Sequence, residues 1–549
     1  MPIVKLARSR VVFFPIAGIF IYLLLFFAYG DFEKVLCRIP DDSAYFFRIA
    51  ENIAAGKGST FDGITRTNGY QPLWLVSLLP ISFAVKKSPE TMTRVYLVFQ
   101  LLIVLGAGLL FFDYHRRVFS LIIGVAASVL FVLLVFFQSA TGMETGVLML
   151  MIGVLFFVGW RMAVFDRDAW LPPVIFGVLL GLTMLARLDL VVLGAAVCGF
   201  CVFQAITLRG HRRAAVKRLA LILAAASMTV LPYLIFNKLA FGSIVPISGI
   251  IKSSFPHVSW QPDKIRSVGA VNLVFVVFAL GYLAWALRAL LKSTGEVAER
   301  RYFRGAMAVL ATTVLLHFAF TVLFMRWGIF RWHFIPYALF ASLAVSEPLD
   351  ALLSARGGGR RWPHAGTYKW AVIGATVVVL AAGSWRVWKR TFGAPVEASW
   401  HVASYRAAVW ARGQTSETDV FAMKDCGNFG YFSQRRVVNL DGVVNNLDYQ
   451  DVLKTGKLKE YLRNSGVRYL VQHDCRPVDD NLLKNIEGGS RTVRDGGYET
   501  ITLQYHSVRY GTYSDPIKVR REEEVYKSQR EGSNDDSATF VIWKLSNRG

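Results

Sequence analysis

Long apolar runs separated by short polar segments fill most of the chain up to residue 388. A helix needs about 20 apolar residues to cross a bilayer, so these runs predict about eleven membrane-spanning helices. We place them at residues 11–29, 92–112, 119–137, 146–164, 171–187, 189–206, 219–241, 271–291, 305–325, 334–353 and 369–388. No cleavage site of small residues follows the first run, which is therefore expected to remain as a helix.

The apolar segment from Pro72 to Val85 does not fit this series. It is short for a span and is followed by Lys86 and Lys87. We predict a juxtamembrane helix that lies in the membrane interface, within one long loop at residues 30–90.

The pattern changes after about residue 388. Strand-like runs at 419–423, 436–440 and 467–472 accompany helical patterns near 400–413 and 449–464. Residues 389–549 are therefore predicted to form a soluble α/β domain, which follows a membrane domain at residues 1–388. The charge-dense stretch 520–537 lacks apolar periodicity, and we expect it to be a loop or disordered.

Composition and charge support a polytopic membrane protein. The 549 residues are 54% hydrophobic and 18% charged, and the mean hydropathy is +0.41. The net charge of +23 comes from basic clusters in every second loop between the predicted spans, so that all of them lie on one side of the membrane, which is the positive-inside pattern rather than a nucleic-acid surface. This pattern predicts a multi-pass protein of the cell membrane with a cytoplasmic N-terminus, an outer C-terminal domain, membrane lipids as neighbours and no nucleic-acid partner.

Cysteines add little to the prediction. Cys198 and Cys201 lie within an apolar span, where helix packing explains them better than metal binding. Cys426 and Cys475 lie in the predicted outer domain, and the sequence leaves open whether they form a disulfide.

Carboxylates mark the outer ends of two predicted spans. Asp41 and Asp42 follow the first span, and Glu144 lies in the segment QSATGMETG after the third. An acidic pair facing water at the membrane surface can deprotonate a sugar hydroxyl or hold a cation. Two acidic clusters on one face predict a shared site.

Cationic and polar residues follow on the same face. The turn LARLD carries Arg187 and Asp189, which could also simply pair with each other. The loop NKLAFGSIVPISGIIK offers Ser248, Lys252 and backbone amides to a phosphate, and RWGIFRWHF adds Arg331 and His333. An anionic lipid headgroup would suit these cations.

The order of these motifs resembles a known family. The segments DDSAYFFRIAENIAAGKGSTFDGITRTNGYQPLW, GMETG, LARLD, FGSIVPISGIIK and FRWHFIP are similar, in this succession, to motifs of the GT-C glycosyltransferases that use lipid-phosphate sugars. Within that superfamily the chain resembles the terminal arabinofuranosyltransferases of the mycobacterial wall and mannosyltransferase-like relatives. VVNLDGVVN extends the resemblance into the C-terminal domain. Two positions depart from the pattern: Leu188 stands where many relatives have proline, and Ile247 separates Pro246 from Ser248.

The resemblance implies a GT-C fold and an inverting transfer of a hexosyl or pentosyl group. The donor would be a polyprenyl-phosphate sugar, and the acceptor a glycan, lipid or protein of the cell envelope. Asp41 or Asp42 would be the general base, with Asp41 favoured, and Glu144 would support the catalytic site. A divalent cation (Mg, Mn or Ca) could bind at Asp42 and Glu144. The implied donor-phosphate ligands are Arg187, Ser248, Lys252, Arg331 and His333, and the implied acceptor-binding residues are Asn68, Tyr70 and Asp189.

Two other classes of membrane protein predict different patterns. A transporter or lipid flippase should carry ionisable residues near mid-span and an internal repeat. A membrane acyltransferase or phosphotransferase should carry a buried catalytic histidine, and we expect the one clear candidate, His317, to serve packing or hydrogen bonding instead. The gathering of charge at one face favours the glycosyltransferase.

Overall fold

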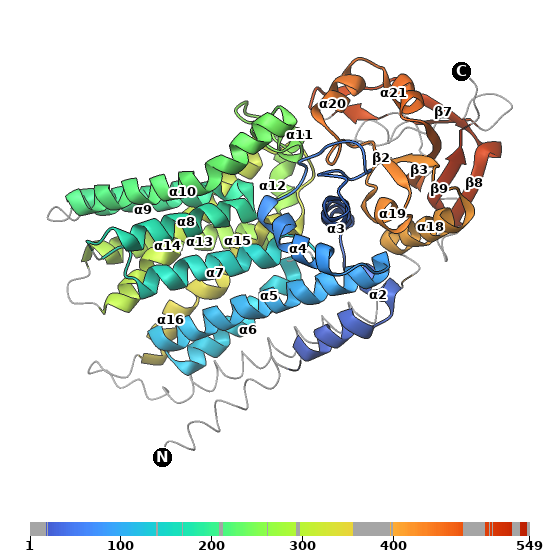
Figure 1. Cartoon of the computed structure of the whole chain (residues 1–549). Coiled ribbons are helices and arrows are strands. Elements are labelled where there is room, and N and C mark those ends of the chain that lie inside the picture. Colours follow the sequence, from blue (N-terminus) through green and yellow to red (C-terminus); the bar gives the residue numbers. More distant parts are fainter. Residues whose placement is uncertain are drawn as a thin grey trace.

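The protein is a helical bundle with an α/β domain at one end. The computed structural model describes residues 18, 20–138, 141–166, 168–207, 212–260, 262–292, 297–354, 396, 399–475, 500–503, 505–507, 509–529 and 538–545. Figure 1 shows the long helices side by side, the sheet domain beyond their ends, and helix α3 (Asp41–Ala54) between the two.

The predicted spans between residues 92 and 353 coincide with helices. These are α5 (Pro89–Val118), α6 (Leu121–Gln138), α7 (Thr145–Arg161), α8 (Leu171–Ala186), α9 (Val191–Thr207), α10 (Arg212–Phe241), α13 (Ala270–Lys292), α14 (Ala298–Phe324), α15 (Ile335–Ala344) and α16 (Ser346–Ser354). Within the described ranges, five helices are both long and apolar enough to cross a membrane: 89–118, 188–207, 212–241, 270–292 and 298–324. The first predicted span is described only in part, as a helix at Phe20–Tyr29, and the predicted span 369–388 lies outside the described residues.

One predicted span is divided. Residues 334–353 form α15 and α16 rather than a single helix. The break falls at Val345, three residues before Pro348, and α15 ends at Ala344, four residues before it. A proline ring clashes with the carbonyl four residues before it but fits the first turn of a new helix, which explains the break.

Short helices cover the end of the bundle near the sheet domain. They are α2 (Phe32–Leu36), α3, α4 (Pro72–Ala84), η1 (Leu188–Leu190), α11 (Ile247–Lys252), α12 (Pro262–Val268) and η3 (Arg331–Phe334). The helix predicted at Pro72 to Val85 is α4, which packs against α3 and α8 and buries Trp74 completely.

The C-terminal domain is built on a mixed five-stranded sheet of order β2-β1-β3-β9-β8. The strands are β1 (Val420–Met423), β2 (Arg436–Asn439), β3 (Val467–Cys475), β8 (Glu524–Gln529) and β9 (Ala538–Lys544); the helices are α18 (Trp400–Gln414), α19 (Gly427–Phe432), α20 (Leu447–Lys454) and α21 (Leu458–Asn464). Small two-stranded sheets pair β4 (Thr500–Leu503) with β7 (Ile517–Arg520), and β5 (His506–Ser507) with β6 (Thr512–Tyr513).

Alternate residues of the sheet face two separate cores. Phe421 and Met423 of β1 join the apolar cluster that continues through α18 and α19 into the membrane domain, whereas Val420 and Ala422 face α20 and α21. Both faces of β1 are therefore covered, as expected for the central strand of a parallel segment.

One prediction for this domain is wrong, and one question that the sequence left open is answered. The stretch 520–537 was expected to be a loop or disordered, but its described part ends β7, forms the turn η6 (Arg521–Glu523) and then forms β8, because pairing with β9 satisfies the backbone of a segment that has little apolar periodicity. Cys426 is a buried free thiol, so it does not pair with Cys475; its sulfur accepts a hydrogen bond from the Asn439 amide at 3.4 Å.

Candidate active site

The two adjacent aspartates at the start of α3 face different surroundings. Asp41 is buried, and its carboxylate accepts hydrogen bonds from the backbone amides of Gly427 at 2.6 Å and Asn428 at 2.7 Å. These amides are the unsatisfied donors at the start of α19, so Asp41 caps a helix of the other domain. A β-carbon at position 427 would collide with the Asp41 carbonyl, so only glycine permits this approach.

Further contacts fix α3 against the C-terminal domain. The Tyr45 hydroxyl accepts a hydrogen bond from the Cys426 amide at 3.1 Å, and Glu51 accepts one from the Tyr431 hydroxyl at 2.6 Å. Arg48 donates to the Gln434 side chain at 3.1 Å. One face of α3 is thus committed to docking the two domains.

Asp42 lies beside Lys252 and remains open to solvent. The Asp42 side chain is 31% exposed and that of Lys252 is 21% exposed, and their charged atoms lie 4.0 Å apart. Within the described part of the chain, neither side chain makes a hydrogen bond. Burial raises the pKa of Asp42 above its ordinary value, Lys252 partly lowers it, and nearby Asp425 raises it. The pair keeps its hydrogen-bonding capacity for a ligand.

The C-terminal domain adds two residues that the sequence did not suggest. Asp425 follows β1, His473 lies near the end of β3, and their side chains meet at 3.1 Å. Because β1 lies between its parallel neighbours β2 and β3, this is the strand-order switch point where open α/β sheets bind ligands. Asp425 also has a left-handed φ of 48°, a strained conformation found at functional sites.

Electrostatics link this dyad to the membrane domain. Burial raises the pKa of Asp425, but the hydrogen bond with His473 and the charges of Lys424 and Lys252 outweigh it, so this pKa lies below its ordinary value. Burial and the charge of Asp425 raise the pKa of Asp441, which follows β2, to about 6. Asp425 is therefore an ionised carboxylate within the electrostatic reach of both Asp42 and Lys252.

A second charged cluster is buried and internally paired. Arg187 is 3% exposed and donates to Glu144 at 2.8 Å, to Asp189 at 2.5 Å and to the Trp332 carbonyl at 3.2 Å. Asp189 also lies 3.3 Å from His317, whose other ring nitrogen faces the Tyr337 hydroxyl at 3.1 Å. The alternative that Arg187 and Asp189 pair with each other is what the structure shows, and His317 serves hydrogen bonding as expected.

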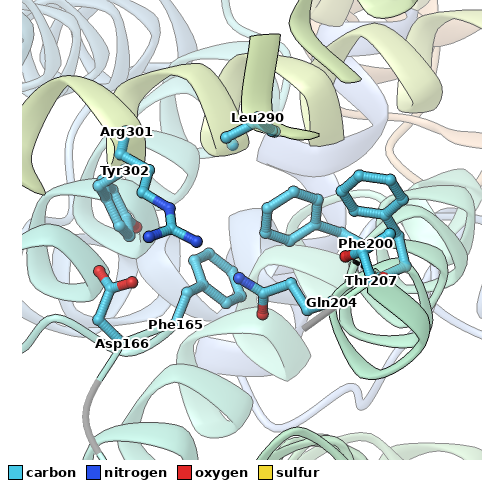
Figure 2. Close-up of a pocket in the computed structure, with 10 residues that line it drawn as sticks. Phe165, Asp166, Phe200, Gln204, Thr207, Leu290, Arg301 and Tyr302 are labelled. Carbon is cyan, nitrogen blue, oxygen red and sulfur yellow. Dashed lines mark hydrogen bonds between the residues drawn. The ribbon is translucent and has the colours of Figure 1, made fainter. Parts of the chain in front are cut away.

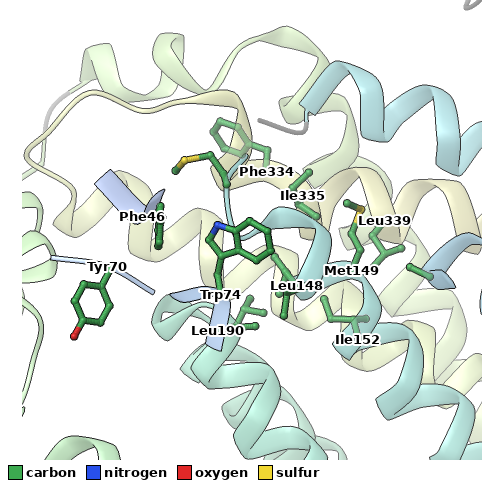
Figure 3. Close-up of a cluster of buried hydrophobic side chains, with 14 of the residues drawn as sticks. Phe46, Tyr70, Trp74, Leu148, Met149, Ile152, Leu190, Phe334, Ile335 and Leu339 are labelled. Atoms are coloured by element: carbon green, nitrogen blue, oxygen red, sulfur yellow. The ribbon is translucent and has the colours of Figure 1, made fainter. Parts of the chain in front are cut away.

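Apolar side chains pack beside the Arg187 cluster. Figure 3 shows Trp74 at the centre of a group that includes Phe46 of α3, Leu148 of α7, Leu190 of η1 and Phe334 of η3. Asp41, Asp42 and Asp189 lie on these elements, and Glu144 and Arg187 directly precede α7 and η1. The Trp74 indole also donates to the Gly142 carbonyl at 3.0 Å, which fixes the loop that leads to Glu144.

The remaining predicted residues occupy varied positions. Arg331 is exposed, with no ion pair to any described residue, and the ring of neighbouring His333 accepts a hydrogen bond from the Phe330 amide at 3.0 Å. Ser248 is half-buried in α11. Asn68 accepts the Ile247 amide at 2.9 Å and so holds the start of α11, while buried Tyr70 bonds to Ser59 at 2.9 Å.

The predicted cation site does not fit the residues. One Glu144 oxygen accepts a hydrogen bond from Arg187, and the side chains of Glu144 and Arg187 are nearly inaccessible, 3% and 4% exposed. Across the described ranges, no three His, Cys, Asp or Glu side chains are arranged to hold a metal ion. We therefore derive no chemical step from a cation at Asp42 and Glu144.

A small cavity lies at the opposite end of the bundle. Figure 2 shows Asp166 and Arg301 pointing into it, together with Gln204 and the rings of Phe165 and Phe200. Its volume of about 20 Å³ is enough for about one water molecule. It is too small for a substrate.

Comparison with known proteins agrees with the fold. The model of a domain of unknown function, DUF8728, matches residues 396–526. No curated protein matches the chain. ArnT from Cupriavidus metallidurans, solved bound to undecaprenyl phosphate, is similar over 96% of this chain and 97% of its own, with 11% identity and a TM-score of 0.52. The archaeal oligosaccharyltransferase AglB from Archaeoglobus fulgidus, solved with an inhibitory peptide and a dolichol-phosphate, covers 91% of this chain and 76% of its own at 15% identity and a TM-score of 0.49.

The similarity to ArnT shows a shared fold. The chain is a polytopic α-helical membrane protein with the GT-C fold and a C-terminal α/β domain, as the sequence predicts. The narrower resemblance to arabinofuranosyltransferases stays a prediction.

Proposed function

We propose that this protein is a membrane glycosyltransferase that transfers a sugar from a polyprenyl-phosphate donor to a glycan, lipid or protein acceptor. The observation that carries the proposal is the pair of Asp42 and Lys252, a partly exposed carboxylate 4.0 Å from an ammonium at the junction of the two domains. A base beside a phosphate ligand is what displacement of a lipid phosphate by a hydroxyl requires.

The base in this proposal is Asp42 rather than Asp41. Both Asp41 oxygens accept backbone amides at 2.6 and 2.7 Å, and the residue is buried in the domain interface, so its carboxylate is committed to docking. Asp42 is open, and its raised pKa makes it a stronger base than an ordinary aspartate. The resemblance favoured Asp41, and the docking role of Asp41 is the reason for the change.

The reaction is a single displacement. Asp42 takes the proton of the acceptor hydroxyl as its oxygen bonds to the anomeric carbon, and the bond from that carbon to the phosphate oxygen breaks. The bonding electron pair leaves with the polyprenyl phosphate, and the cations of Lys252 and exposed Arg331 stabilise the negative charge that develops there. One base without a second nucleophile implies inversion at the anomeric carbon.

Arg187, Asp189 and Glu144 take a supporting role in this proposal. Their charges are already paired with one another. In this proposal Arg187 therefore does not bind the donor phosphate, and Asp189 does not bind the acceptor. Asp425 and His473 join the site instead: the Asp425 charge raises the pKa of Asp42, and the hydrogen bond from His473 keeps Asp425 in place.

The membrane helices around Lys252 suit a lipid donor. Lys252 ends α11, which lies in the connection between α10 and α13, and the apolar windows of these two spans are each only 17% buried. Leu239 of α10 and Val274 of α13 are among their exposed apolar side chains. A polyprenyl chain along these helices would place its phosphate at Lys252.

The proposal includes an orientation of the protein in the membrane. From the distribution of basic residues we place the N-terminus in the cytoplasm and the C-terminal domain outside. Single cysteines introduced at exposed positions of the C-terminal domain should react with an impermeant maleimide in intact cells. Labelling only after cell lysis would contradict this orientation.

The decisive experiment uses purified protein in nanodiscs with radiolabelled polyprenyl-phosphate sugars and a panel of envelope glycans, lipids and peptides. Transfer should depend on the lipid-linked sugar and be lost in Asp42→Asn. Transfer from nucleotide sugars but not from lipid-linked sugars would refute the donor assignment, and so would transfer that the Asp42→Asn protein retains in full.

A further inference from the structure

A polar cavity lies to one side of the Asp42–Lys252 pair, where three separate segments meet. It has a volume of about 190 Å³. Residues 66–68 of the first loop form one wall, residues between 240 and 247, from the end of α10 to the start of α11, form the second, and residues 445–448 before and within α20 form the third. Both domains therefore contribute to it.

Several groups that line the cavity have free hydrogen-bonding capacity. Within the described part of the chain, the side chains of Arg66, Ser243 and Asp448 make no hydrogen bond or ion pair. The side-chain oxygen of Asn446 caps α20 by accepting the Tyr449 amide at 3.0 Å, which leaves the side-chain nitrogen of Asn446 for a ligand. Phe241 adds a half-buried aromatic ring.

This combination suits a neutral, polyhydroxylated ligand. Hydroxyl groups can use both the donors of Arg66 and Asn446 and the acceptor oxygens of Asp448. The single cation is matched by a single carboxylate, so the cavity has no excess of positive charge for a phosphate. Its polar lining is equally unsuited to a hydrocarbon chain, which gains nothing from burial beside unpaired polar groups.

Size and position restrict the ligand further. Cavities for drug-sized molecules begin at about 300 Å³, so about 190 Å³ corresponds to one sugar ring. Ile247 lines the cavity and Lys252 ends the same helix five residues later, a rise of about 7.5 Å. A sugar in the cavity would thus lie one or two units away from the reacting hydroxyl.

We infer that this cavity binds one neutral sugar unit of an oligosaccharide acceptor, remote from the hydroxyl that is glycosylated. This inference rests on the proposed glycosyltransferase function and specifies its acceptor as a chain of at least two sugars. The first-loop residue Asn68 both lines the cavity and holds the start of α11, so it links acceptor recognition to the helix that carries Lys252.

Binding of neutral saccharides tests the inference without turnover. The full-length protein in nanodiscs is titrated, in the absence of donor, with mannose and arabinofuranose oligosaccharides of one to four units. Asp448→Ala and Arg66→Ala should each weaken binding of the di- and trisaccharides about tenfold, because each removes a charged hydrogen-bonding partner. Asp451→Ala, on the same helix but outside the cavity, should leave binding unchanged, and unfolding temperatures identify any misfolded variant.

Kinetics distinguish whether the sugar in the cavity belongs to the acceptor or to the donor. With an acceptor of two or more units, the Asp448→Ala protein should show about a tenfold higher KM, an unchanged donor KM and an unchanged kcat. A monosaccharide acceptor should be unaffected. A raised donor KM would assign the cavity to the donor sugar and overturn the inference.

Two binding results would overturn the inference, and a third result would separate it from the proposed function. Equal binding by wild type and both variants would overturn the inference, as would tighter binding of mannose 6-phosphate than of mannose. If the wild type binds oligosaccharides in an Asp448-dependent manner but transfers no lipid-linked sugar, the proposed function fails while the binding site stands.

Discussion

Two charged clusters lie near the junction of the domains, and they differ in how far their hydrogen bonds are satisfied. Arg187 is surrounded by Glu144, Asp189 and a backbone carbonyl, and its side chain is 4% exposed. Lys252 faces Asp42 at 4.0 Å, and both remain partly open. The same residue types thus form a structural core in one place and a candidate reaction centre in the other. Partners, rather than charge alone, decide the role.

The largest expected effect is in the buried cluster. Arg187→Ala leaves buried Glu144 and half-buried Asp189 without their cation, so the free energy of unfolding should fall by about 3–5 kcal/mol. Thermal unfolding in nanodiscs measures it. Lys252→Ala is the matched control, since its open ion pair should contribute less than about 1 kcal/mol. Equal losses in the two variants would remove the distinction between the clusters.

Asp42→Asn, in contrast to Arg187→Ala, should lower activity and leave stability unchanged. The amide preserves the shape of the side chain but cannot accept the acceptor proton, so kcat should fall by about 100-fold or more. Donor binding and the unfolding temperature should be retained. The measurement is initial rates with saturating donor, and a kcat close to that of the wild type would exclude Asp42 as the base.

Lys252→Ala and Arg331→Ala should weaken donor binding. A charge-assisted hydrogen bond to phosphate contributes about 1.5–3 kcal/mol, which corresponds to roughly 10- to 150-fold in Kd for each variant. Titration with polyprenyl-phosphate sugar in nanodiscs gives these values. Donor affinity unchanged in both variants would leave the two side chains a role in packing alone.

Asp41→Ala should affect domain docking more than chemistry. It removes the cap of α19, so the free energy of unfolding should fall by about 1–2 kcal/mol. Proteolysis between the domains should become faster, while kcat per folded molecule falls far less than in Asp42→Asn. If Asp41→Ala abolished turnover without any change in stability, Asp41 rather than Asp42 would be the general base.

The smallest expected effect is a shift in pH dependence. The pKa of Asp42 is raised by burial, so activity should be lost as the pH falls through this raised pKa. Lys252 lowers that pKa, and its removal should therefore move the acidic limb of the kcat profile to higher pH. Asp425→Asn removes a charge that raises the pKa and should move the limb to lower pH. The reverse shifts would contradict Asp42 as the titrating group.

The fold was largely predictable because its signal is local. The span at 270–292, for example, is an apolar run with only Asn272 and Arg288 before its final lysine, and its length and composition indicate a membrane helix. The β-strand at Glu524–Gln529 was missed, because its stability comes from pairing with β9 rather than from its own apolar pattern.

The site was predictable only as a set of motifs. The sequence indicated that Asp41, Asp42, Lys252 and Arg187 belong to one face, but two adjacent aspartates cannot reveal which of them meets a distant helix. Asp425 lies 383 or more residues from the acidic pair, and only the fold brings them together. A short signal did exist: DCG follows the strand predicted at 419–423 after a single lysine, which is where ligand-binding residues of a parallel sheet are expected.

The Asp41 cap has a consequence for the time course of synthesis. Its partner amide, that of Asn428, lies 387 residues later in the chain. At about 5–20 residues per second, a ribosome needs roughly 20–80 s to produce that amide after Asp41 has been made. Until then α3 lacks the surface that Asp41, Tyr45 and Glu51 contact. The contacts that dock the two domains therefore form only after residue 428 has been made, so α3 lacks its docking partner while the membrane helices between residues 89 and 354 are already synthesised.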